Sequence, residues 1–334
     1  MQRDLIMAVH IFVVSEENYK ICIRRGLAAI PGGTKPDIND QLISRMVMIR
    51  PDDRILFYIK GKKEIHGVYR AVDRVFYDEE PVWSIPENKA FPYRIKIDNS
   101  AYVFKQPLFL SDIYDLRDSG KLWTFSLERP SGRGNSMFAI SDVEFEEIFQ
   151  LFLKVNKVYS QPPHIKEPYR HIEPNSLTKL HFDKDGQPKY ESTLVSLFLD
   201  SLSNGRYHEL FGIYSDYLAY VPTSFQKEID ALLFHTHPNK DDLIVAYTII
   251  ELKREIFKED GLSQLLRYED WFLKKRVNGD SRAIRTVAIA KNFSEGVGEY
   301  LQKRELLEGK KAVLMKYTVV NNLLNLQIIN EKNI

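Results

Sequence analysis

Closely spaced prolines in the middle of the chain constrain its fold more than any other feature. Within residues 156–176 they are Pro162, Pro163, Pro168 and Pro174. A proline fixes its own φ angle and lacks an N–H, so a segment with one every few residues holds neither a helix nor a central strand. We therefore predict a linker over residues 156–176 between a first domain at residues 1–155 and a second at residues 177–334. The 334 residues suffice for two domains of ordinary size.

Composition excludes several classes of protein. No apolar run reaches the roughly 18 residues of a membrane-spanning helix. Cys22 is the only cysteine, which excludes a disulfide framework and a cysteine zinc site. A lone cysteine is typical of a reducing compartment, so we expect a cytoplasmic protein with no membrane partner. The net charge of +1 is low for a protein that binds nucleic acid through bulk charge, although a local basic groove would be enough.

Hydrophobic alternation and helical spacing predict a strand-rich first domain with flanking helices. Strands are expected at residues 8–15, 54–60, 64–76 and 93–97. Helices are expected at residues 16–26, 38–49 and 141–152. The last of these helices begins with a capping box formed by Ser141 and Glu144.

The pattern of the second domain is typical of an α/β fold. Helices are expected at residues 190–202, 261–275 and 294–305. Strands are expected at residues 213–219, 228–235, 243–252 and 285–290, with a final strand at 312–319. The run from Leu243 to Leu252 is continuously apolar, which predicts a strand buried on both faces.

Acidic and basic side chains stand at the end of that apolar strand. Strand alternation points Glu251 and Lys253 to the same face of the sheet. Asp230 lies on the preceding strand, and antiparallel pairing of the two strands can bring it close to Glu251. Two carboxylates and a main-chain carbonyl suit a hard cation such as Mg²⁺ or Mn²⁺. The sequence therefore predicts a metal site in which Lys253 orients and activates a water molecule or holds a phosphate.

Two neighbouring elements offer further polar groups to this site. Gln264 and Tyr268 are four residues apart and share a face of their predicted helix. Glu191 begins the helix at residues 190–202 and would supply a third carboxylate. The alternative is a surface ion pair within the Glu-x-Lys tripeptide, unrelated to the other carboxylates. The gathered set of polar residues favours the metal site.

These segments resemble the PD-(D/E)xK nuclease superfamily, most of all its branch with a Gln-x-x-x-Tyr helix, as in RecB-type and NucS-type nucleases. The resemblance covers residues 176–320, with a long turn and a missing glycine before Ile229 as departures. It implies a restriction-endonuclease-like mixed sheet flanked by helices and a Mg²⁺-dependent endodeoxyribonuclease. By the resemblance, Asp230 and Glu251 hold the metal. The catalytic and supporting residues are Lys253, Glu191, Gln264 and Tyr268.

Aromatic and short polar side chains stand out in the first domain. Trp83 and Trp123 fall in polar loops, where a tryptophan either anchors a small core or is held out for stacking. Ser15 and Asn18 follow the first predicted strand, and Tyr58 lies within the strand at residues 54–60.

Residues 8–150 resemble the EVE domain, a YTH-like member of the PUA superfamily. The matching stretches are Ile11–Asn18, Pro51–Lys60, Ile65–Tyr69, Tyr77–Trp83, Phe91–Lys96 and Ser131–Ser141. The resemblance implies a PUA-like strand-rich barrel with flanking helices, which reads a modified base flipped into an aromatic cage. The implied base-binding residues are Ser15, Asn18, Tyr58, Trp83 and Trp123. Contacts to phosphates would come from Lys60, Lys62, Lys63 and Arg133.

Together the two resemblances imply a base reader joined to a metal nuclease. This is the architecture expected of a modification-dependent restriction-type endonuclease that cuts DNA containing, for example, methylated or hydroxymethylated cytosine. One alternative is a structure-specific repair nuclease that acts on branched or mismatched DNA. The other is a non-catalytic protein that binds RNA or DNA. RNA as the partner and a homodimer as the assembly both remain open at this point.

Overall fold

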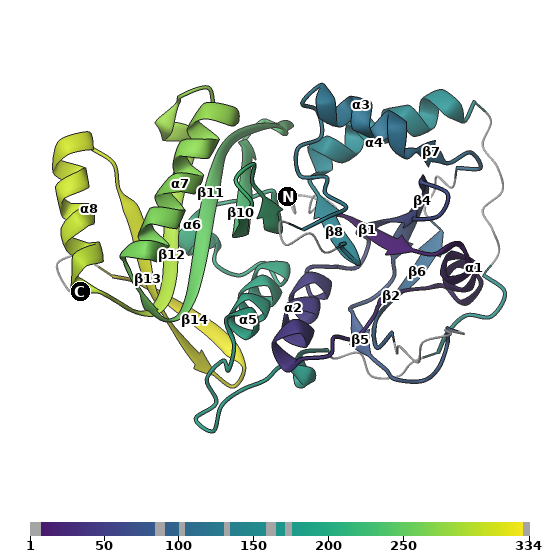
Figure 1. The fold of residues 1–334 in the computed structure, drawn as a ribbon, viewed down its shortest axis with the longest axis horizontal. Helices are drawn as coiled ribbons and strands as arrows, with labels where there is room; N and C mark the ends of the chain where they lie inside the picture. The colour runs from purple at the N-terminus through teal and green to yellow at the C-terminus, as the bar shows by residue number, and fades with distance from the viewer. Residues whose placement is uncertain are drawn as a thin grey trace. The chain divides into compact units, whose positions relative to one another are not determined.

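The computed structural model describes residues 8–83, 91–99, 104–129, 134–157, 165–170 and 176–329. The chain divides into two compact units, Met1–Leu180 and His181–Ile334. Each unit is built on one sheet with flanking helices, as Figure 1 shows. No helix in the described ranges is long and apolar enough to cross a membrane.

The sheet of the first unit forms a half-barrel with strand order β2-β6-β4-β3-β1-β8, to which β5 adds beside β6 and β7 beside β4. Its strands are β1 (Val9–Val14), β2 (Leu27–Ile30), β3 (Arg54–Ile59), β4 (Glu64–Ala71), β5 (Phe76–Tyr77), β6 (Tyr93–Asn99), β7 (Leu108–Phe109) and β8 (Met137–Ile140). Its helices are α1 (Glu16–Arg25), α2 (Pro36–Met46), α3 (Leu110–Asp118), α4 (Asp142–Val155) and a 3₁₀ helix, Ser176–Lys179. The strands β2, β7 and β8 and the helix α3 were missed by the sequence analysis.

The core of this unit lies between the sheet and the helices α3 and α4. Alternate residues of β1, Val9 and Ile11, belong to this core together with Ile113 of α3 and Phe152 of α4. The predicted capping box begins α4, where the Oγ of Ser141 accepts from the backbone N–H of Glu144.

The segment expected to be a free linker packs in part against the first unit. The backbone N–H of Glu167 donates to the carbonyl of Arg24 at 3.1 Å, and that of Tyr169 donates to Arg25 at 2.9 Å. Tyr169 is 6% exposed. The division between the units falls after Leu180 and not at residues 156–176. Prolines exclude regular structure but do not prevent an extended segment from packing. Pro162, Pro163 and Pro174 lie outside the described residues.

The sheet of the second unit has the strand order β14-β13-β12-β11-β10-β9. Its strands are β9 (Asp216–Pro222), β10 (Glu228–His237), β11 (Lys240–Phe257), β12 (Ile284–Phe293), β13 (Ala312–Val320) and β14 (Leu323–Ile329). The pairs β11–β12 and β12–β13 are parallel and the other pairs are antiparallel. The helices are α5 (Glu191–Ser203), α6 (His208–Phe211), α7 (Glu259–Lys275) and α8 (Glu295–Glu308). Helix α7 packs on β11 and β12, and α5 packs on β11 and β14.

Two expectations for this sheet are wrong. The strand at residues 312–319 is not the last one, because a tight turn follows it and β14 pairs back antiparallel. The apolar run in β11 is buried on both faces only in its second half. Ile249 and Ile250 are fully buried, whereas Leu243 is 47% and Val245 is 43% exposed. An apolar run indicates a strand, but it does not show where the covering helices end.

Candidate active site

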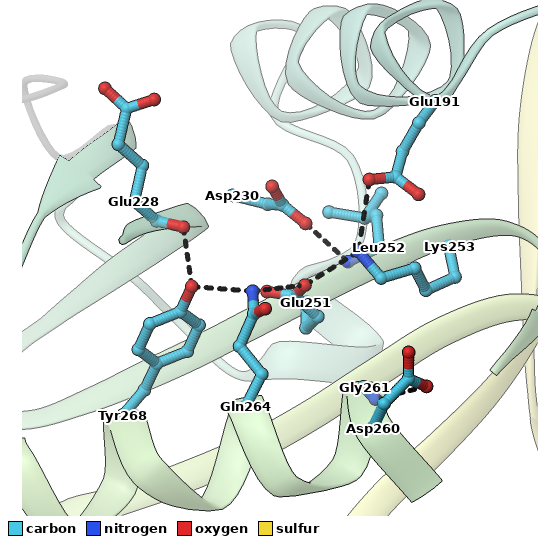
Figure 2. A network of polar contacts seen from close by, with 10 residues as sticks. All are labelled: Glu191, Glu228, Asp230, Glu251, Leu252, Lys253, Asp260, Gly261, Gln264 and Tyr268. Carbon is cyan, nitrogen blue, oxygen red and sulfur yellow. Dashed lines mark hydrogen bonds and ion pairs between the residues drawn. The ribbon is translucent and has the colours of Figure 1, made fainter. Parts of the chain in front are cut away.

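The pairing of β10 with β11 places the two predicted metal ligands together. The strands are antiparallel, with Ala231 opposite Ile250, so Asp230 and Glu251 are neighbours across the pair. The Oδ2 of Asp230 accepts from the backbone N–H of Leu252 at 2.8 Å (Figure 2). This juxtaposition agrees with the expectation from strand alternation.

Glu251 is 1% exposed and is held by one of its two carboxylate oxygens. The Oε1 atom lies 2.9 Å from the Nζ of Lys253 and accepts from the Nε2 of Gln264 at 2.9 Å. The Oε2 atom is buried and has no hydrogen-bond partner among the described residues. Burial raises the pKa of Glu251, although the charge of Lys253 opposes the shift. A buried carboxylate oxygen without a donor is costly unless a ligand meets it.

The charges around Glu251 affect each other. Burial raises the pKa of Asp230 well above its ordinary value, and the charge of Glu251 adds to this shift. Burial alone would lower the pKa of Lys253. The three surrounding carboxylates, of Glu251, Asp230 and Glu191, outweigh it and raise the pKa of Lys253. Lys253 is therefore protonated at neutral pH.

Glu191 approaches the site from the first residue of α5. Its Oε1 lies 3.1 Å from the Nζ of Lys253, so Lys253 bridges Glu191 and Glu251 (Figure 2). No group of three or more His, Cys, Asp or Glu residues in the described ranges is placed to hold a metal ion. Glu191 therefore lies at the site, where its contact is with the lysine, and its role as a third carboxylate stays a prediction.

A chain of hydrogen bonds fixes Glu251 from the side of α7. The Nε2 of Gln264 donates to Glu251 and also lies 2.7 Å from the hydroxyl of Tyr268. That hydroxyl donates to the carbonyl of Glu228 at 2.7 Å. Tyr268 is fully buried. The spacing of four residues along the helix brings Gln264 and Tyr268 together as predicted.

The sequence analysis missed two residues that extend this network. The ring of Phe225, in the turn between β9 and β10, is stacked with that of Tyr268, with centroids 5.7 Å apart. The guanidinium of Arg267 lies over Phe225, 4.2 Å from its ring centroid. A phenylalanine in the polar turn Thr223–Lys227 was the available signal.

Replacing Asp230 with Asn tests the electrostatics of the site. An acid with a raised folded-state pKa stabilises the fold below about pH 4, the ordinary carboxylate pKa. That stabilisation is lost as the pH rises through the folded-state pKa. An asparagine keeps an oxygen for the N–H of Leu252 but carries no charge. We expect the Tm of Asp230→Asn to exceed that of the wild type by a margin that grows from pH 5 to pH 8, in thermal melts without divalent cations. A difference in Tm that stays constant between pH 5 and pH 8 would contradict the raised pKa of Asp230.

The predicted base-binding residues do not form one exposed cage. Trp83 is 8% exposed, and its ring packs on Phe91 and on the guanidinium of Arg94. It is a core anchor and not a ring held out for stacking. Tyr58 is 7% exposed and belongs to the core below α3 and α4. Trp123 is half-buried, and its backbone N–H donates to Glu144 of α4.

The polar candidates of the first unit lie at the surface. Ser15 is exposed and caps α1, because its Oγ accepts from the backbone N–H of Asn18 at 3.2 Å. The three lysines predicted to contact phosphates share the exposed turn between β3 and β4. They are Lys60, Lys62 and Lys63. Lys62 also lies 3.0 Å from Glu16. Arg133 lies outside the described residues.

Residues 39–151 match the model of the EVE domain. This stretch runs from α2 to α4. No curated protein matches the chain.

Solved structures similar to the chain include three proteins. A hypothetical protein from Leishmania major shares 16% identity with a TM-score of 0.33, over 45% of this chain and 96% of that one. A repair endonuclease from Pyrococcus abyssi shares 23% with a TM-score of 0.21, over 30% of this chain and 36% of that one. The YTH domain of the Zygosaccharomyces rouxii MRB1 protein, in complex with N6-methyladenosine RNA, shares 13% with a TM-score of 0.28, over 44% and 86%.

Proposed function

We propose that the protein is a metal-dependent endonuclease that cuts DNA when its first unit recognises a modified base. The EVE domain at residues 39–151 supports the recognition of modified nucleic acid. The unpartnered Oε2 of Glu251, buried beside Asp230, carries the proposal of a metal site. The nuclease part of the proposal also rests on the sequence motif around these residues.

The residues present fit a small divalent cation. Asp230 and Glu251 would hold it, because Mg²⁺ and Mn²⁺ prefer oxygen ligands and need only one or two carboxylates beside water and phosphate oxygens. A cation bound there would lower the pKa of a water molecule and neutralise charge that develops on the scissile phosphate.

The chain's own residues orient the reacting groups. The ion pairs with Glu191 and Glu251 keep the ammonium of Lys253 at the site, where it would stabilise negative charge on a phosphate or orient the attacking water. Glu191 positions Lys253 from α5. Gln264 and Tyr268 fix the carboxylate of Glu251 from α7. Both tasks that the sequence analysis gave Lys253, at the water and at the phosphate, are kept in this proposal.

Reading of a modified base is proposed for the first unit as a whole. Flipping a base costs a few kcal/mol, and stacking on aromatic rings returns about 1–3 kcal/mol per base. The exposed Ser15 and the half-buried Asn18 at the start of α1 are the polar candidates for reading its edge. Cleavage of both strands would need two active sites, which a homodimer would supply. The buried Cys22 thiol suits the cytoplasmic location that we propose.

Two matched plasmids test this function, one unmodified and one containing 5-methylcytosine or 5-hydroxymethylcytosine. We expect the protein with Mg²⁺ or Mn²⁺ to cut the modified plasmid selectively. Equal cutting of both plasmids would overturn modification dependence and favour a nuclease that senses DNA structure. Cutting of neither plasmid, with retained binding of the modified one, would favour a non-catalytic reader.

A further inference from the structure

The turn between β9 and β10 is held by hydrogen bonds beside the candidate active site. The backbone N–H of Thr223 donates to the carbonyl of Lys227 at 2.9 Å, and the hydroxyl of Thr223 donates to the same oxygen at 2.8 Å. The indole N–H of Trp271, on α7, donates to the Oγ of Ser224 at 2.8 Å. The turn is thereby closed on itself and tied to the helix that carries Gln264.

This turn holds Phe225 between the active-site tyrosine and an arginine. Phe225 is stacked with Tyr268 at 5.7 Å between ring centroids and an interplanar angle of 26°. The guanidinium of Arg267 lies 4.2 Å from the centroid of Phe225. Tyr268 is linked through Gln264 to Glu251. Four contacts therefore connect Arg267 to the proposed metal ligand, through Phe225, Tyr268 and Gln264.

The guanidinium of Arg267 has no hydrogen-bond or ion-pair partner among the described residues. The acidic side chains nearest to it in the sequence are engaged elsewhere. Asp270 pairs with Lys274 at 2.6 Å, and Glu269 pairs with Arg304 at 2.6 Å. Arg267 itself is exposed. The guanidinium is therefore accessible to solvent, and its contact with the ring of Phe225 restricts the side chain.

A guanidinium in this state is suited to one class of ligand. Its planar fork matches the oxygens of a phosphate in a bidentate pair, and a restricted side chain loses less entropy on binding. We propose that Arg267, oriented by Phe225, binds a backbone phosphate of the nucleic-acid strand next to the phosphate that is cut. This inference rests on the proposed nuclease function, since it places the strand across Glu251 and Lys253.

The salt dependence of DNA binding tests this role without cleavage. The probe is a fluorescein-labelled single-stranded DNA of 20 nucleotides, titrated in EDTA at several salt concentrations. The slope of log K against log salt is negative, and loss of one phosphate contact reduces its magnitude by about 0.7 for a single strand. We expect Arg267→Ala to show this loss. Arg267→Lys should keep the slope, and Phe225→Leu should weaken binding with the slope retained.

A matched control separates the local contact from overall charge. Arg282 is exposed and pairs with Asp280 at 3.0 Å, so Arg282→Ala removes the same charge from another surface of the unit. If Arg267→Ala and Arg282→Ala change the slope equally, Arg267 is not a phosphate contact and the inference fails. If only Arg267→Ala reduces the magnitude of the slope, Arg267 contacts a phosphate, and this result is independent of whether the wild type cuts DNA. The plasmid assay decides the proposed function separately.

Discussion

Replacing Glu251 with Gln is expected to lower the cleavage rate by at least about 100-fold while the protein stays folded. Loss of a preorganised group that stabilises transition-state charge typically has an effect of this size. The amide oxygen of a glutamine can still accept from Lys253 and Gln264, so the hydrogen bonds to Oε1 are kept. The buried charge that would hold a cation is lost. Single-turnover cleavage of the modified plasmid measures the effect.

Two further measurements make this result specific. Glu255 lies on the same strand, is exposed and pairs with Arg254 at 3.0 Å, so Glu255→Gln removes the same charge outside the site and should leave the rate unchanged. Mg²⁺ at 100 times its Kd should stabilise the wild type by about 2.7 kcal/mol and leave the Tm of Glu251→Gln unchanged. If Glu251→Gln cleaves the plasmid at the rate of the wild type, the metal site has been assigned wrongly.

Local geometry made much of the candidate site predictable. Glu251 and Lys253 share a face because strand side chains alternate, and Gln264 and Tyr268 meet because a helix turns every 3.6 residues. These rules act over a few residues and need no knowledge of the fold. The approach of Asp230 needed one further assumption, the antiparallel pairing of two strands joined by a short turn.

Contacts between distant segments were beyond such rules. Lys253 bridges to Glu191 because α5 packs on β11, and 62 residues separate the two side chains. The position of Phe225 on Tyr268 likewise depends on how one turn meets α7. The burial of individual side chains was also difficult to predict from the sequence. Trp83 stands in a polar stretch of sequence, but its ring is covered by Arg94 and Phe91, which no pattern near it reveals.

Replacing Arg94 with Ala is expected to lower the free energy of unfolding of the first unit by about 3–5 kcal/mol. Arg94 is 1% exposed and donates to the carbonyls of Phe91 and Glu80 and to the hydroxyl of Tyr169. Its Nη1 also lies 3.7 Å from the carboxylate of Asp78. Without the guanidinium, these partly buried acceptors have one donor fewer, and Asp78 loses its cation. The large effect comes from leaving several acceptors without a donor, and this cost exceeds the contribution of any single hydrogen bond.

Denaturant unfolding followed by tryptophan fluorescence measures this effect. The chain has three tryptophans, so in a Trp271→Phe background Trp83 and Trp123 report on the first unit alone. Tyr169→Phe removes one hydroxyl from the cluster and should cost about 1 kcal/mol. Arg24→Ala, at an exposed position, should change stability by less than about 0.5 kcal/mol. If Arg94→Ala costs no more than Arg24→Ala, residues 165–170 are not held to the first unit by this cluster. That result would favour the interpretation of the proline-rich segment as a simple linker.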